Sequence, residues 1–367
     1  MNQKPRILLI TAAFGEGHNS AAKNLALALN AAGAETRVAD PCLLSAPQST
    51  AFLQWGYRLV TTHFPKVWEK IYKDTDKCDF SRPDMPLMGR PERYLSTLIE
   101  EFQPTAIVST YPIYPYFLHR IFNETFRKVP VFTVITDSIE INASWLRAPT
   151  DWFLVTDKTT LEIMRCWGIP EEKIINTGFP VNPAFKDMQP VSREDNCKPF
   201  RVLYFPTAKK PFVRRHARAI LEASPDVHIT IVMGKNFRLL QSRARQIRAE
   251  YPGRVRLLGW TKKVPQLLEK HHLVVGKAGG ATVHEAIAAR VPMLIHHLVP
   301  GQEEGNLQLL QHLNAGDIAE EPADLTEAIS NILANDAVKW RRMKAALAEK
   351  GFNDGAITAS TFILNHI

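Results

Sequence analysis

The sequence predicts an α/β protein made of two doubly wound domains, each with a parallel sheet between two layers of helices. Short β-branched runs alternate with helical patterns along most of the chain, which is typical of this class. A stretch rich in proline and polar residues interrupts the alternation at 179–199. The chain has 367 residues, more than one hydrophobic core usually serves.

The composition is that of a globular protein, with 45% hydrophobic and 22% charged residues. No apolar run approaches the ~20 residues of a membrane span. The N-terminal stretch MNQKPRILLITAAFGEGH resembles a first β-strand more than a signal peptide, because it lacks a small-residue cleavage site. The four cysteines are far apart, without a CxxC pair, so we expect a reduced, cytosolic protein with neither a zinc site nor a disulfide framework.

The formal net charge is +8, and the basic residues gather in two clusters, at 209–218 and 235–256. Clusters of this kind suit anionic lipid headgroups or phosphorylated substrates. Solvated helix faces are the simpler alternative. No nucleic-acid-binding motif accompanies the charge, so we expect no nucleic-acid partner.

The first half of the chain contains five predicted strands with helical patterns between them. An Ala/Leu-rich stretch at 20–32 predicts a helix that ends at Gly33, and a second helix is expected at 114–125. The strands are expected at 6–11, 36–39, 105–109, 131–135 and 152–155.

One segment, 49–89, departs from the alternation and is predicted to be an amphipathic insertion. It carries aromatic side chains, among them Trp55, Tyr57 and Trp68, together with several basic residues. Helices of this composition can lie in a membrane interface. Ordinary packing of the insertion onto the first domain is the alternative.

The second half restarts the alternation after the linker. Strands are expected at 201–205, 228–233, 255–258, 273–275 and 293–295. We therefore predict a first domain at 1–185, a linker at 186–200, a second domain at 201–350, and a C-terminal helix at 351–367 that packs back on the first domain. Ligands of such sheets bind beyond the carboxyl ends of the strands, so functional residues are expected there.

The first candidate motif, Phe14-Gly15-Glu16-Gly17-His18-Asn19-Ser20, follows the first strand and opens a helix. Its glycines allow a tight turn and a close approach of ligand to backbone. The spacing is not that of the dinucleotide-binding fingerprint. His18 is placed to act as a general base on a hydroxyl group, and a helix-capping role is the alternative.

The second candidate motif, Gly276-Lys277-Ala278-Gly279-Gly280-Ala281-Thr282, lies between a strand and a helix. Its glycines bring backbone N–H groups to a helix N-terminus, an arrangement that suits a diphosphate. Glu285 lies in the first turns of that helix and is placed to accept hydrogen bonds from ribose hydroxyls. A favourable charge near the helix start is the alternative for Glu285.

The third candidate motif, Val299-Pro300-Gly301-Gln302-Glu303-Glu304-Gly305-Asn306, follows the next strand. Pro300-Gly301 makes a turn, after which Gln302 and Glu303 offer adjacent acceptors suited to the hydroxyls of a sugar. Capping of the following helix is the structural alternative. A metal site is not indicated, because magnesium usually needs more converging carboxylates.

The second and third motifs together resemble the glycosyltransferase family of monogalactosyldiacylglycerol synthases and bacterial diacylglycerol glucosyltransferases, within glycosyltransferase family 28. Members of that family carry KAG-x-x-T-x-x-E followed by PGQE-x-GN. This chain has both elements at that spacing, with a glycine-rich GEGH turn near its start. The stretch Val134-Ile135-Thr136-Asp137 with Trp145, and the element Thr177-Gly178-Phe179-Pro180-Val181, also resemble the family. The resemblance covers nearly the whole chain.

The resemblance implies a GT-B fold of two Rossmann-like domains, and an inverting transfer of a hexose from a UDP-sugar to a membrane lipid such as diacylglycerol. It implies no cofactor and no catalytic metal. His18 and Asp137 are the candidates for deprotonating the acceptor, and the resemblance does not choose between them. The implied acceptor-binding residues are Gly17, Trp55, Tyr57, Trp68 and Trp145. The implied donor-binding residues are Gly279, Gly280, Thr282, Glu285, Gln302, Glu303 and Asn306, to which the departure described next adds Lys209 as a candidate.

Two positions depart from the family pattern. The family usually has a glycine-rich loop after the first strand of the second domain, where this chain has Phe205-Pro206-Thr207-Ala208-Lys209-Lys210-Pro211-Phe212. The lysines there can direct positive charges toward a diphosphate in place of the missing backbone N–H groups. The alternative is that donor binding is weakened or altered. Asn142 stands near the position where a histidine is expected in the central stretch of the family. Unlike a histidine, asparagine cannot titrate, so the acceptor is handled differently there if this position takes part.

The expected protein is cytoplasmic and peripherally bound to the inner face of an anionic cell membrane. Three alternatives stay open at this point: a UDP-GlcNAc 2-epimerase-like enzyme, a transferase for a soluble acceptor, and a donor-binding module without turnover. The sequence does not identify the sugar, since galactose and glucose differ at one hydroxyl.

Overall fold

The structure is a computed structural model, and it describes residues 4–78, 80–81, 88–125, 128–188, 197–208, 210–350 and 353–367. The chain divides into two compact units. The first contains residues 1–183, 299–305 and 354–367, and the second contains residues 184–298 and 306–353. The expected linker, 186–200, lies partly outside the described residues.

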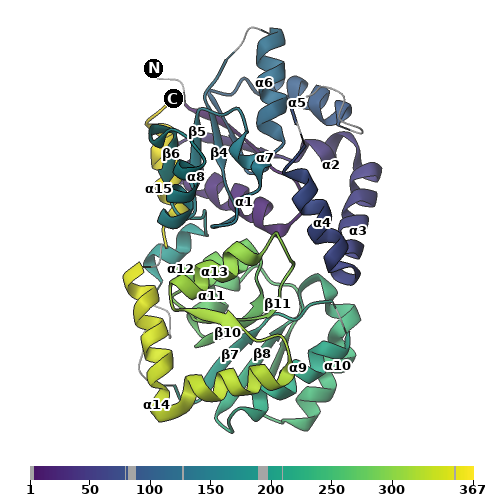
Figure 1. Cartoon of the computed structure of the whole chain (residues 1–367), viewed down its shortest axis with the longest axis vertical. Helices are drawn as coiled ribbons and strands as arrows, with labels where there is room; N and C mark the ends of the chain where they lie inside the picture. Colours follow the sequence, from purple (N-terminus) through teal and green to yellow (C-terminus); the bar gives the residue numbers. More distant parts are fainter. Residues whose placement is uncertain are drawn as a thin grey trace. The chain divides into compact units, whose positions relative to one another are not determined.

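The first unit is built on a six-stranded parallel sheet with the strand order β2-β1-β3-β4-β5-β6. Figure 1 shows its strands with helices packed around them. The strands are β1 Arg6–Ile10, β2 Glu35–Ala39, β3 Ala106–Ser109, β4 Val131–Val134, β5 Trp152–Val155 and β6 Ile174–Asn176.

The helices of the first unit follow the strands in alternation, apart from a group of four between β2 and β3. They are α1 Glu16–Ala31, α2 Pro41–Ser45, α3 Pro47–His63, α4 Pro65–Thr75, α5 Gly89–Phe102, α6 Tyr114–Thr125, α7 Ala143–Leu146, α8 Lys158–Cys166 and α15 Gly355–Leu364. A 3-10 turn, η1 Glu171–Lys173, precedes β6, and another, η2 Pro183–Asp187, follows it where the chain passes from the first unit to the second.

Strand β1 divides the core of the first unit into two layers because its side chains alternate between the faces of the sheet. Leu8 and Ile10 pack with α5 and α6, whereas Ile7 and Leu9 pack with α1 and α15. The C-terminal helix α15 thus lies against α1, where Ala359 joins the second layer.

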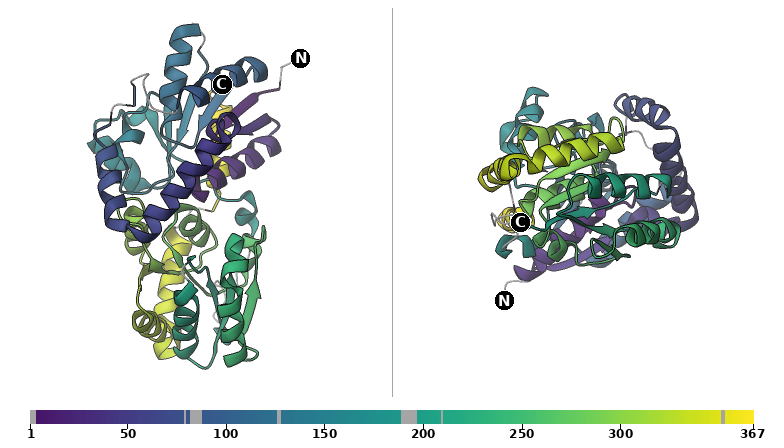
Figure 2. Two further views of the ribbon diagram at one scale, coloured as in Figure 1. Left: turned by 90° about the vertical axis from the view of Figure 1, so that its right-hand side faces the viewer. Right: turned by 90° about the horizontal axis from the view of Figure 1, so that it is seen from below.

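The insertion between β2 and β3 forms α3 and α4, each beginning with a proline at its first helical position. The two helices contact each other and appear as a dark-blue pair in Figure 2. Part of the insertion, 79 and 82–87, lies outside the described residues.

The second unit is built on another six-stranded parallel sheet, with the order β12-β11-β10-β7-β8-β9. Its strands are β7 Phe200–Tyr204, β8 Val227–Val232, β9 Val255–Leu258, β10 Leu273–Lys277, β11 Met293–His297 and β12 Gly316–Ile318. Its helices are α9 Lys210–Glu222, α10 Phe237–Glu250, α11 Val264–Glu269, α12 Gly280–Ala288, α13 Glu304–His312 and α14 Pro322–Lys350, with a 3-10 turn η4 Gly234–Asn236. Helix α14 is interrupted at residues 334–337.

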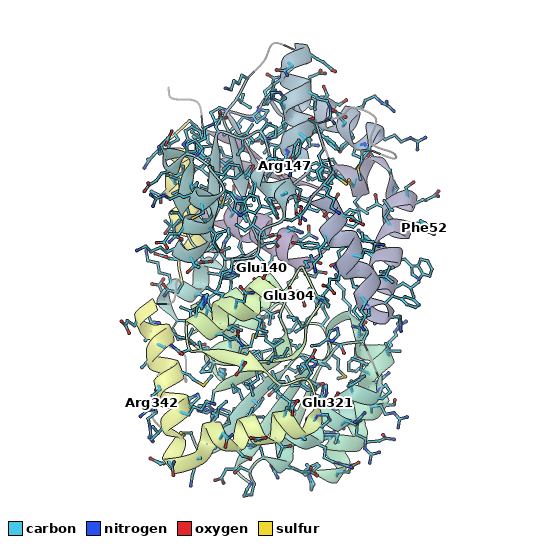
Figure 3. The ribbon with its side chains drawn as sticks, in the orientation of Figure 1. Phe52, Glu140, Arg147, Glu304, Glu321 and Arg342 are labelled. Carbon is cyan, nitrogen blue, oxygen red and sulfur yellow. The ribbon has the colours of Figure 1, made fainter. Side chains whose placement is uncertain are left out.

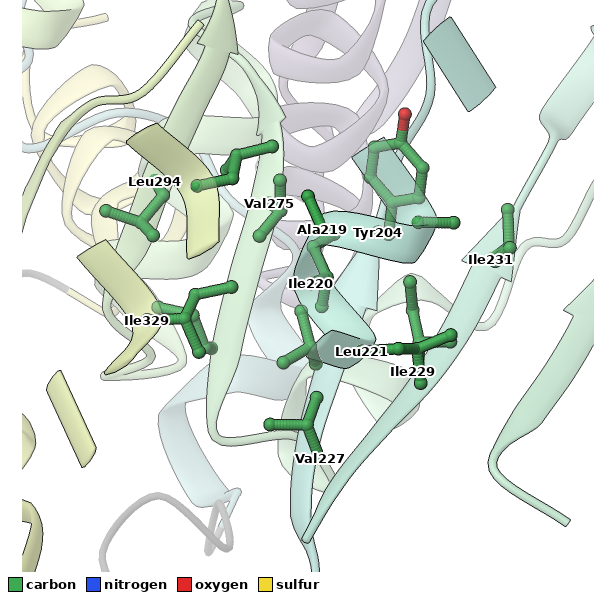
Figure 4. Packing of buried hydrophobic residues seen from close by; sticks show 14 of the residues in the cluster. Tyr204, Ala219, Ile220, Leu221, Val227, Ile229, Ile231, Val275, Leu294 and Ile329 are labelled. Carbon is green, nitrogen blue, oxygen red and sulfur yellow. The ribbon is translucent and has the colours of Figure 1, made fainter. Parts of the chain in front are cut away.

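One face of this second sheet packs against α9, α10 and α14 to form a large apolar core. Val227, Ile229 and Ile231 of β8 point into it, beside Ile220 of α9 (Figure 4). Because β8 alternates, its residues 228 and 230 face the other side of the sheet.

These observations confirm the predicted doubly wound α/β architecture. The prediction omitted β6 and β12, three-residue strands at the edges of their sheets, whose short patterns give little periodicity. The first helix also begins earlier than expected, at Glu16, because Gly15 adopts the extended N-cap conformation. His18 therefore lies in the first turn of α1.

Candidate active site

His18 lies buried in the first turn of α1, at the carboxyl end of β1. A hydrogen bond of 2.9 Å joins its Nδ1 atom to the hydroxyl of Thr136, which follows β4. The hydroxyl of Thr110 donates to the carbonyl oxygen of His18 at 3.1 Å. These two contacts fix both the ring and the helix start. Burial lowers the pKa of His18 to about 4, so its imidazole is neutral at pH 7.

Asp137 follows Thr136 directly, beyond the end of β4. Its Oδ2 atom accepts a hydrogen bond of 2.8 Å from the indole N–H of Trp145. Burial raises the pKa of Asp137 to about 6, although the Trp145 hydrogen bond opposes the shift. This carboxylate is therefore mostly ionised at pH 7 and has a pKa close to that of an efficient general base.

His18, Asp137 and Trp145 belong to one cluster at the carboxyl edge of the first sheet. The rings of His18 and Trp145 lie 6.0 Å apart, and Tyr111 meets the His18 ring edge-on at 5.2 Å. Gly17 precedes His18 in the same turn and is half-buried. The structure thus brings four residues predicted from the sequence, His18, Asp137, Trp145 and Gly17, to one end of the parallel sheet, where ligands bind in such folds.

Asn142 caps α7 rather than standing open toward a ligand. Its Oδ1 accepts from the backbone N–H of Ser144 at 2.9 Å. Its Nδ2 donates to the Thr75 hydroxyl at 2.9 Å and to the carbonyl oxygen of Tyr72 at 3.3 Å. The side chain of Asp76 accepts from the next backbone N–H, that of Ala143, at 2.8 Å. Asn142 therefore attaches the C-terminal end of α4 to the cluster.

Tyr72, on α4, has a buried hydroxyl group on which the charge of Asp137 acts. This hydroxyl has no hydrogen-bond partner among the described residues. The pKa of Tyr72 is raised by burial first, and then by the negative charges of Asp137, Asp76 and Glu140. A neutral O–H that lacks a protein partner is suited to donate a hydrogen bond to a ligand oxygen.

The structure separates the aromatic residues of the insertion into two groups. Tyr57 and Trp68 pack edge-to-face across α3 and α4, with ring centroids 4.9 Å apart. Trp55 is instead exposed, with 59% of its surface accessible, and Phe52 projects outward from the same helix (Figure 3). The predicted acceptor-binding residues of the insertion therefore do not form one patch.

The exposed group forms two apolar stripes of matching spacing, which we call the hairpin stripes. Residues spaced by three and four positions share one helix face, and each stripe follows this spacing. One stripe consists of Phe52, Trp55 and Leu59 on α3. The other consists of Phe64, which precedes α4, and of Val67 and Ile71 on α4. The basic residues Arg58, Lys66, Lys70 and Lys73 are exposed on the same two helices.

The segment 299–305, which carries the third motif, belongs to the first unit. The hydroxyl of Tyr57 donates to Oε1 of Gln302 at 2.8 Å. Oε2 of Glu303, which is buried, accepts from the backbone N–H of Val299 at 3.0 Å and so closes the turn of its own segment. Gln302 was expected at the donor and Tyr57 at the acceptor, and the structure brings these two side chains together.

Glycines allow this segment to pack closely. Gly301 has a φ of +79°, which favours glycine, and a Cβ added there would meet Cδ1 of Tyr72 at 2.8 Å. A Cβ added to Gly305 would overlap with the carbonyl oxygen of Ser138. Both positions therefore exclude a side chain.

The second motif forms the turn between β10 and α12 in the second unit. Gly279 is the N-cap of α12 and is extended, and no side chain caps the helix. The N–H groups of the first turn, which includes Gly280 and Thr282, are therefore free of a capping side chain. Together with the helix dipole they suit an anionic group such as a diphosphate.

Glu285 follows in the second turn of α12, where it is half-buried. Its carboxylate forms no hydrogen bond or ion pair with another described residue. Burial raises the pKa of Glu285 to about 7. A carboxylate that is desolvated without a partner is destabilised, and hydroxyl donors from a ligand would stabilise it.

Asn306, at the start of α13, is buried in the second unit, and its Nδ2 donates to the carbonyl oxygen of Ala278 at 3.0 Å. This bond fixes the turn that leads to Gly279. Its Oδ1 atom is buried without a partner among the described residues. Asn306 is thus a positioning residue for the glycine turn.

The loop between β7 and α9, which lacks the expected glycines, is held by a histidine. Nε2 of His296, on β11, lies 3.0 Å from the carbonyl oxygen of Phe205 and donates to it. The backbone N–H of Phe205 donates to the carbonyl oxygen of Val275 at 2.9 Å. Lys209, predicted to bind the donor, lies outside the described residues.

Sequence reasoning missed Thr136 and Tyr72 as functional candidates. Thr136 stands next to Asp137 in the quoted central stretch, so its position was a signal. The role of Tyr72 depends on the packing of α4 against Asn142, which no sequence pattern indicates.

Among the described residues, no group of three His, Cys, Asp or Glu side chains converges as a set of metal ligands. None of the helices in the described part of the chain combines the length and apolar character that a membrane crossing requires.

Comparison with known families matches both halves of the chain. Residues 18–181 match the model for monogalactosyldiacylglycerol (MGDG) synthase, and residues 209–358 match the C-terminal domain of glycosyltransferase family 28. The processive diacylglycerol beta-glucosyltransferase of Bacillus subtilis is 25% identical over 353 residues, covering 94% of this chain and 91% of that protein. The Bacillus licheniformis enzyme of the same name is 26% identical over 353 residues, covering 94% and 90%.

Solved structures share the architecture at lower identity. The Acinetobacter baumannii MurG structure has a TM-score of 0.64 at 14% identity, covering 98% of this chain and 99% of that one. The structure of S. aureus MnaA with UDP has a TM-score of 0.61 at 15% identity, covering 99% and 98%. These likenesses concern the fold, which is GT-B. Because its N-terminal part matches the MGDG synthase family and its C-terminal part matches the C-terminal domain of glycosyltransferase family 28, the chain is a glycosyltransferase related to the diacylglycerol glucosyltransferases.

Proposed function

We propose that this glycosyltransferase transfers a hexose from a UDP-sugar to the hydroxyl of a diacylglycerol-type lipid, with inversion, at the cytoplasmic surface of an anionic membrane. The observation that carries the proposal is the pairing of two desolvated proton acceptors, His18 and Asp137, in one cluster with Trp145. A hydroxyl acceptor must lose a proton as it attacks, and both groups are deprotonated at pH 7.

The chemistry can be assigned to named atoms. The acceptor oxygen attacks the anomeric carbon, its proton passes to Asp137 or His18, and the bond between that carbon and the diphosphate breaks. The pKa of about 6 favours Asp137, because a base with a pKa near the working pH combines availability with proton affinity. His18, held by Thr136, then orients the acceptor oxygen.

The donor half of the proposal rests on the second unit. The uncapped start of α12 offers N–H groups and a partial positive charge to the diphosphate of the leaving UDP. The unpaired carboxylate of Glu285 suits ribose hydroxyls. The S. aureus MnaA structure contains UDP in the same fold, which supports a nucleoside diphosphate sugar as the donor class.

The lipid half rests on the hairpin stripes and on the relatives. Exposed aromatic and aliphatic side chains beside lysines are typical of helices that lie in a membrane interface. The relatives named as diacylglycerol glucosyltransferases match 94% of this chain. A soluble acceptor would leave the hairpin stripes without a role.

A transfer assay tests the whole proposal. The protein is incubated with UDP-glucose or UDP-galactose and with phosphatidylglycerol vesicles that contain diacylglycerol, and UDP release and glycolipid are measured. Glycolipid from one of these donors is expected. Transfer to soluble sugars alone would contradict the lipid acceptor, and no transfer or donor hydrolysis with either donor would contradict the proposal.

Calorimetry tests the donor half by itself. Micromolar binding of UDP without added metal is expected. Asn306→Ala should weaken it about tenfold, because the turn at Ala278 loses its hydrogen bond. Gln311→Ala is the matched control, since Gln311 lies on the same helix and its side-chain amide donates to exposed Asp317, away from the glycine turn. Equal affinity in all three proteins would contradict a donor site at this turn.

A further inference from the structure

A cavity of about 410 Å³ lies in the second unit, at the amino ends of its strands. It lies over the starts of β8 and β9 and is bounded by the connection from α11 to β10. Ligands of doubly wound folds usually bind at the opposite, carboxyl ends, where the Gly279 turn lies. The cavity therefore has no part in the donor site described above.

Strand register places polar side chains on one face of the sheet at this cavity. Arg201 pairs with His228, and Thr230 pairs with Arg256. Paired residues of parallel strands point to the same face, and residues two apart on one strand do so as well. These four side chains therefore share the face opposite to the apolar core. Parallel sheets usually bury both faces under apolar side chains, so this polar row is unusual.

Cations line the cavity, and no carboxylate among the described residues does. Arg201, Arg254, Arg256 and Lys270 are all lining residues. The side chains of Arg256 and Lys270 are exposed and form no hydrogen bond or ion pair with another described residue. Four positive charges with no carboxylate among the described lining residues create a local positive potential that attracts anions.

Two of the four arginine and lysine residues are held in place by backbone carbonyl groups. Nε of Arg201 donates to the carbonyl oxygen of Lys270 at 2.7 Å. Arg254 donates to the carbonyl oxygens of Val227, Leu221 and Ser224 at 2.9, 2.6 and 2.8 Å. Because those bonds fix the wall, Arg256 and Lys270 are left to meet a ligand.

His271 also lines the cavity, and its imidazole makes two polar contacts. It is buried, with Nδ1 donating to the carbonyl oxygen of Leu267 at 2.5 Å and Nε2 2.8 Å from the Thr230 hydroxyl. Its pKa is lowered to about 4, chiefly by burial, with Arg201 and Arg256 contributing.

We propose that this cavity binds a phosphate-bearing anion, contacted by Arg256 and Lys270 against the wall that Arg201 and Arg254 fix. Arginine and lysine are the usual partners of phosphate oxygens. The volume suits a small organic phosphate, or the headgroup of a phospholipid that enters from the rim. The shared chemistry is the phosphate group.

The experiment measures two probes with saturating UDP present, so that the donor site is occupied. Glycerol 3-phosphate is titrated by calorimetry, and cosedimentation compares phosphatidylglycerol with phosphatidylcholine vesicles. The pocket variant is Arg256→Ala/Lys270→Ala. Its matched control is Arg245→Ala/Arg248→Ala, which removes two exposed charges from α10 outside the cavity. Thermal melting and UDP binding verify that each variant is folded.

Two results support the proposal and separate the sources of the phosphate. If glycerol 3-phosphate affinity falls at least tenfold in the pocket variant alone, the ligand is a soluble phosphate ester. If instead the preference for phosphatidylglycerol vesicles falls at least tenfold in that variant alone, the ligand is a lipid headgroup. Equal behaviour of the pocket variant and the α10 control with both probes would overturn the proposal. UDP binding and sugar transfer are read separately, so failure of the proposed function would leave this result interpretable.

Discussion

The indole N–H of Trp145 donates to Oδ2 of Asp137 at 2.8 Å, and the same indole ring lies 6.0 Å from the ring of His18. Trp145 thus contacts one candidate base directly and packs near the other. The two bases differ in pKa, about 6 for Asp137 and about 4 for His18, because burial raises the pKa of a carboxyl group and lowers that of an imidazole. This difference makes their roles separable by pH.

The pH dependence of transfer identifies the base. A base acts only when deprotonated, so activity falls as pH drops through its pKa. We expect kcat/KM for the acceptor, measured at saturating donor, to fall below pH 6 with an inflection near 6, as Asp137 requires. An inflection near 4 would assign the base to His18. Asp137→Asn should lower kcat by about 10² to 10⁴ and remove the inflection.

Trp145→Phe should move this inflection to higher pH. Its hydrogen bond favours the charged form of Asp137, so its loss raises the pKa of that carboxyl further. A shift of about half a unit to one unit is expected. Trp152→Phe is the matched control, because Trp152 packs against Phe132 and Phe362 away from the cluster. A Trp145→Phe profile that coincides with the control would show that the hydrogen bond does not tune Asp137.

Gly301→Ala should reduce transfer more than its backbone strain explains. Gly301 and Gly168 both have positive φ, +79° and +85°, so alanine at either costs about 1 kcal/mol. Only at Gly301 would the new Cβ meet Tyr72, on whose hydroxyl the charge of Asp137 acts. We expect Gly301→Ala to lower the melting temperature more than Gly168→Ala, because its Cβ also displaces the Tyr72 ring, and we expect a loss of kcat/KM of tenfold or more in Gly301→Ala alone. Equal kcat/KM values in the two variants would mean that displacing the Tyr72 ring has no effect on transfer.

Membrane binding should depend on the hairpin stripes. Phe52→Ser/Trp55→Ser removes two exposed aromatic side chains from α3, and should weaken binding to phosphatidylglycerol vesicles about tenfold or more, since their interfacial burial contributes a few kcal/mol. Trp167→Ser is the control, because Trp167 is 66% exposed on the same unit but outside the insertion. Cosedimentation measures both. Equal losses would indicate general hydrophobic adsorption instead of binding through α3.

Much of the fold was predictable because its signals are local. The strands β1, β3, β4, β7 and β10 are short apolar runs between turn residues, and the glycines at 15–17 and 279–280 mark the turns that open α1 and α12. The edge strands β6 and β12 were missed because three residues carry too little pattern. The positions of His18, Asp137 and Glu285 beyond strands or within helix starts also followed from the sequence.

The tertiary structure decided what those residues can do. Segments distant in the chain bury these residues. That burial produces the Thr136 contact of His18, the raised pKa of Asp137 and the raised pKa of Glu285. The bond from Tyr57 to Gln302 joins residues 245 positions apart. By itself the sequence determined two doubly wound domains and the motifs at their turns, because backbone propensity and hydrophobic periodicity act over neighbouring residues. Only the folded chain decided desolvation, hydrogen-bond partners and the separation of the insertion into exposed stripes and packed aromatics, because these depend on which distant surfaces exclude water.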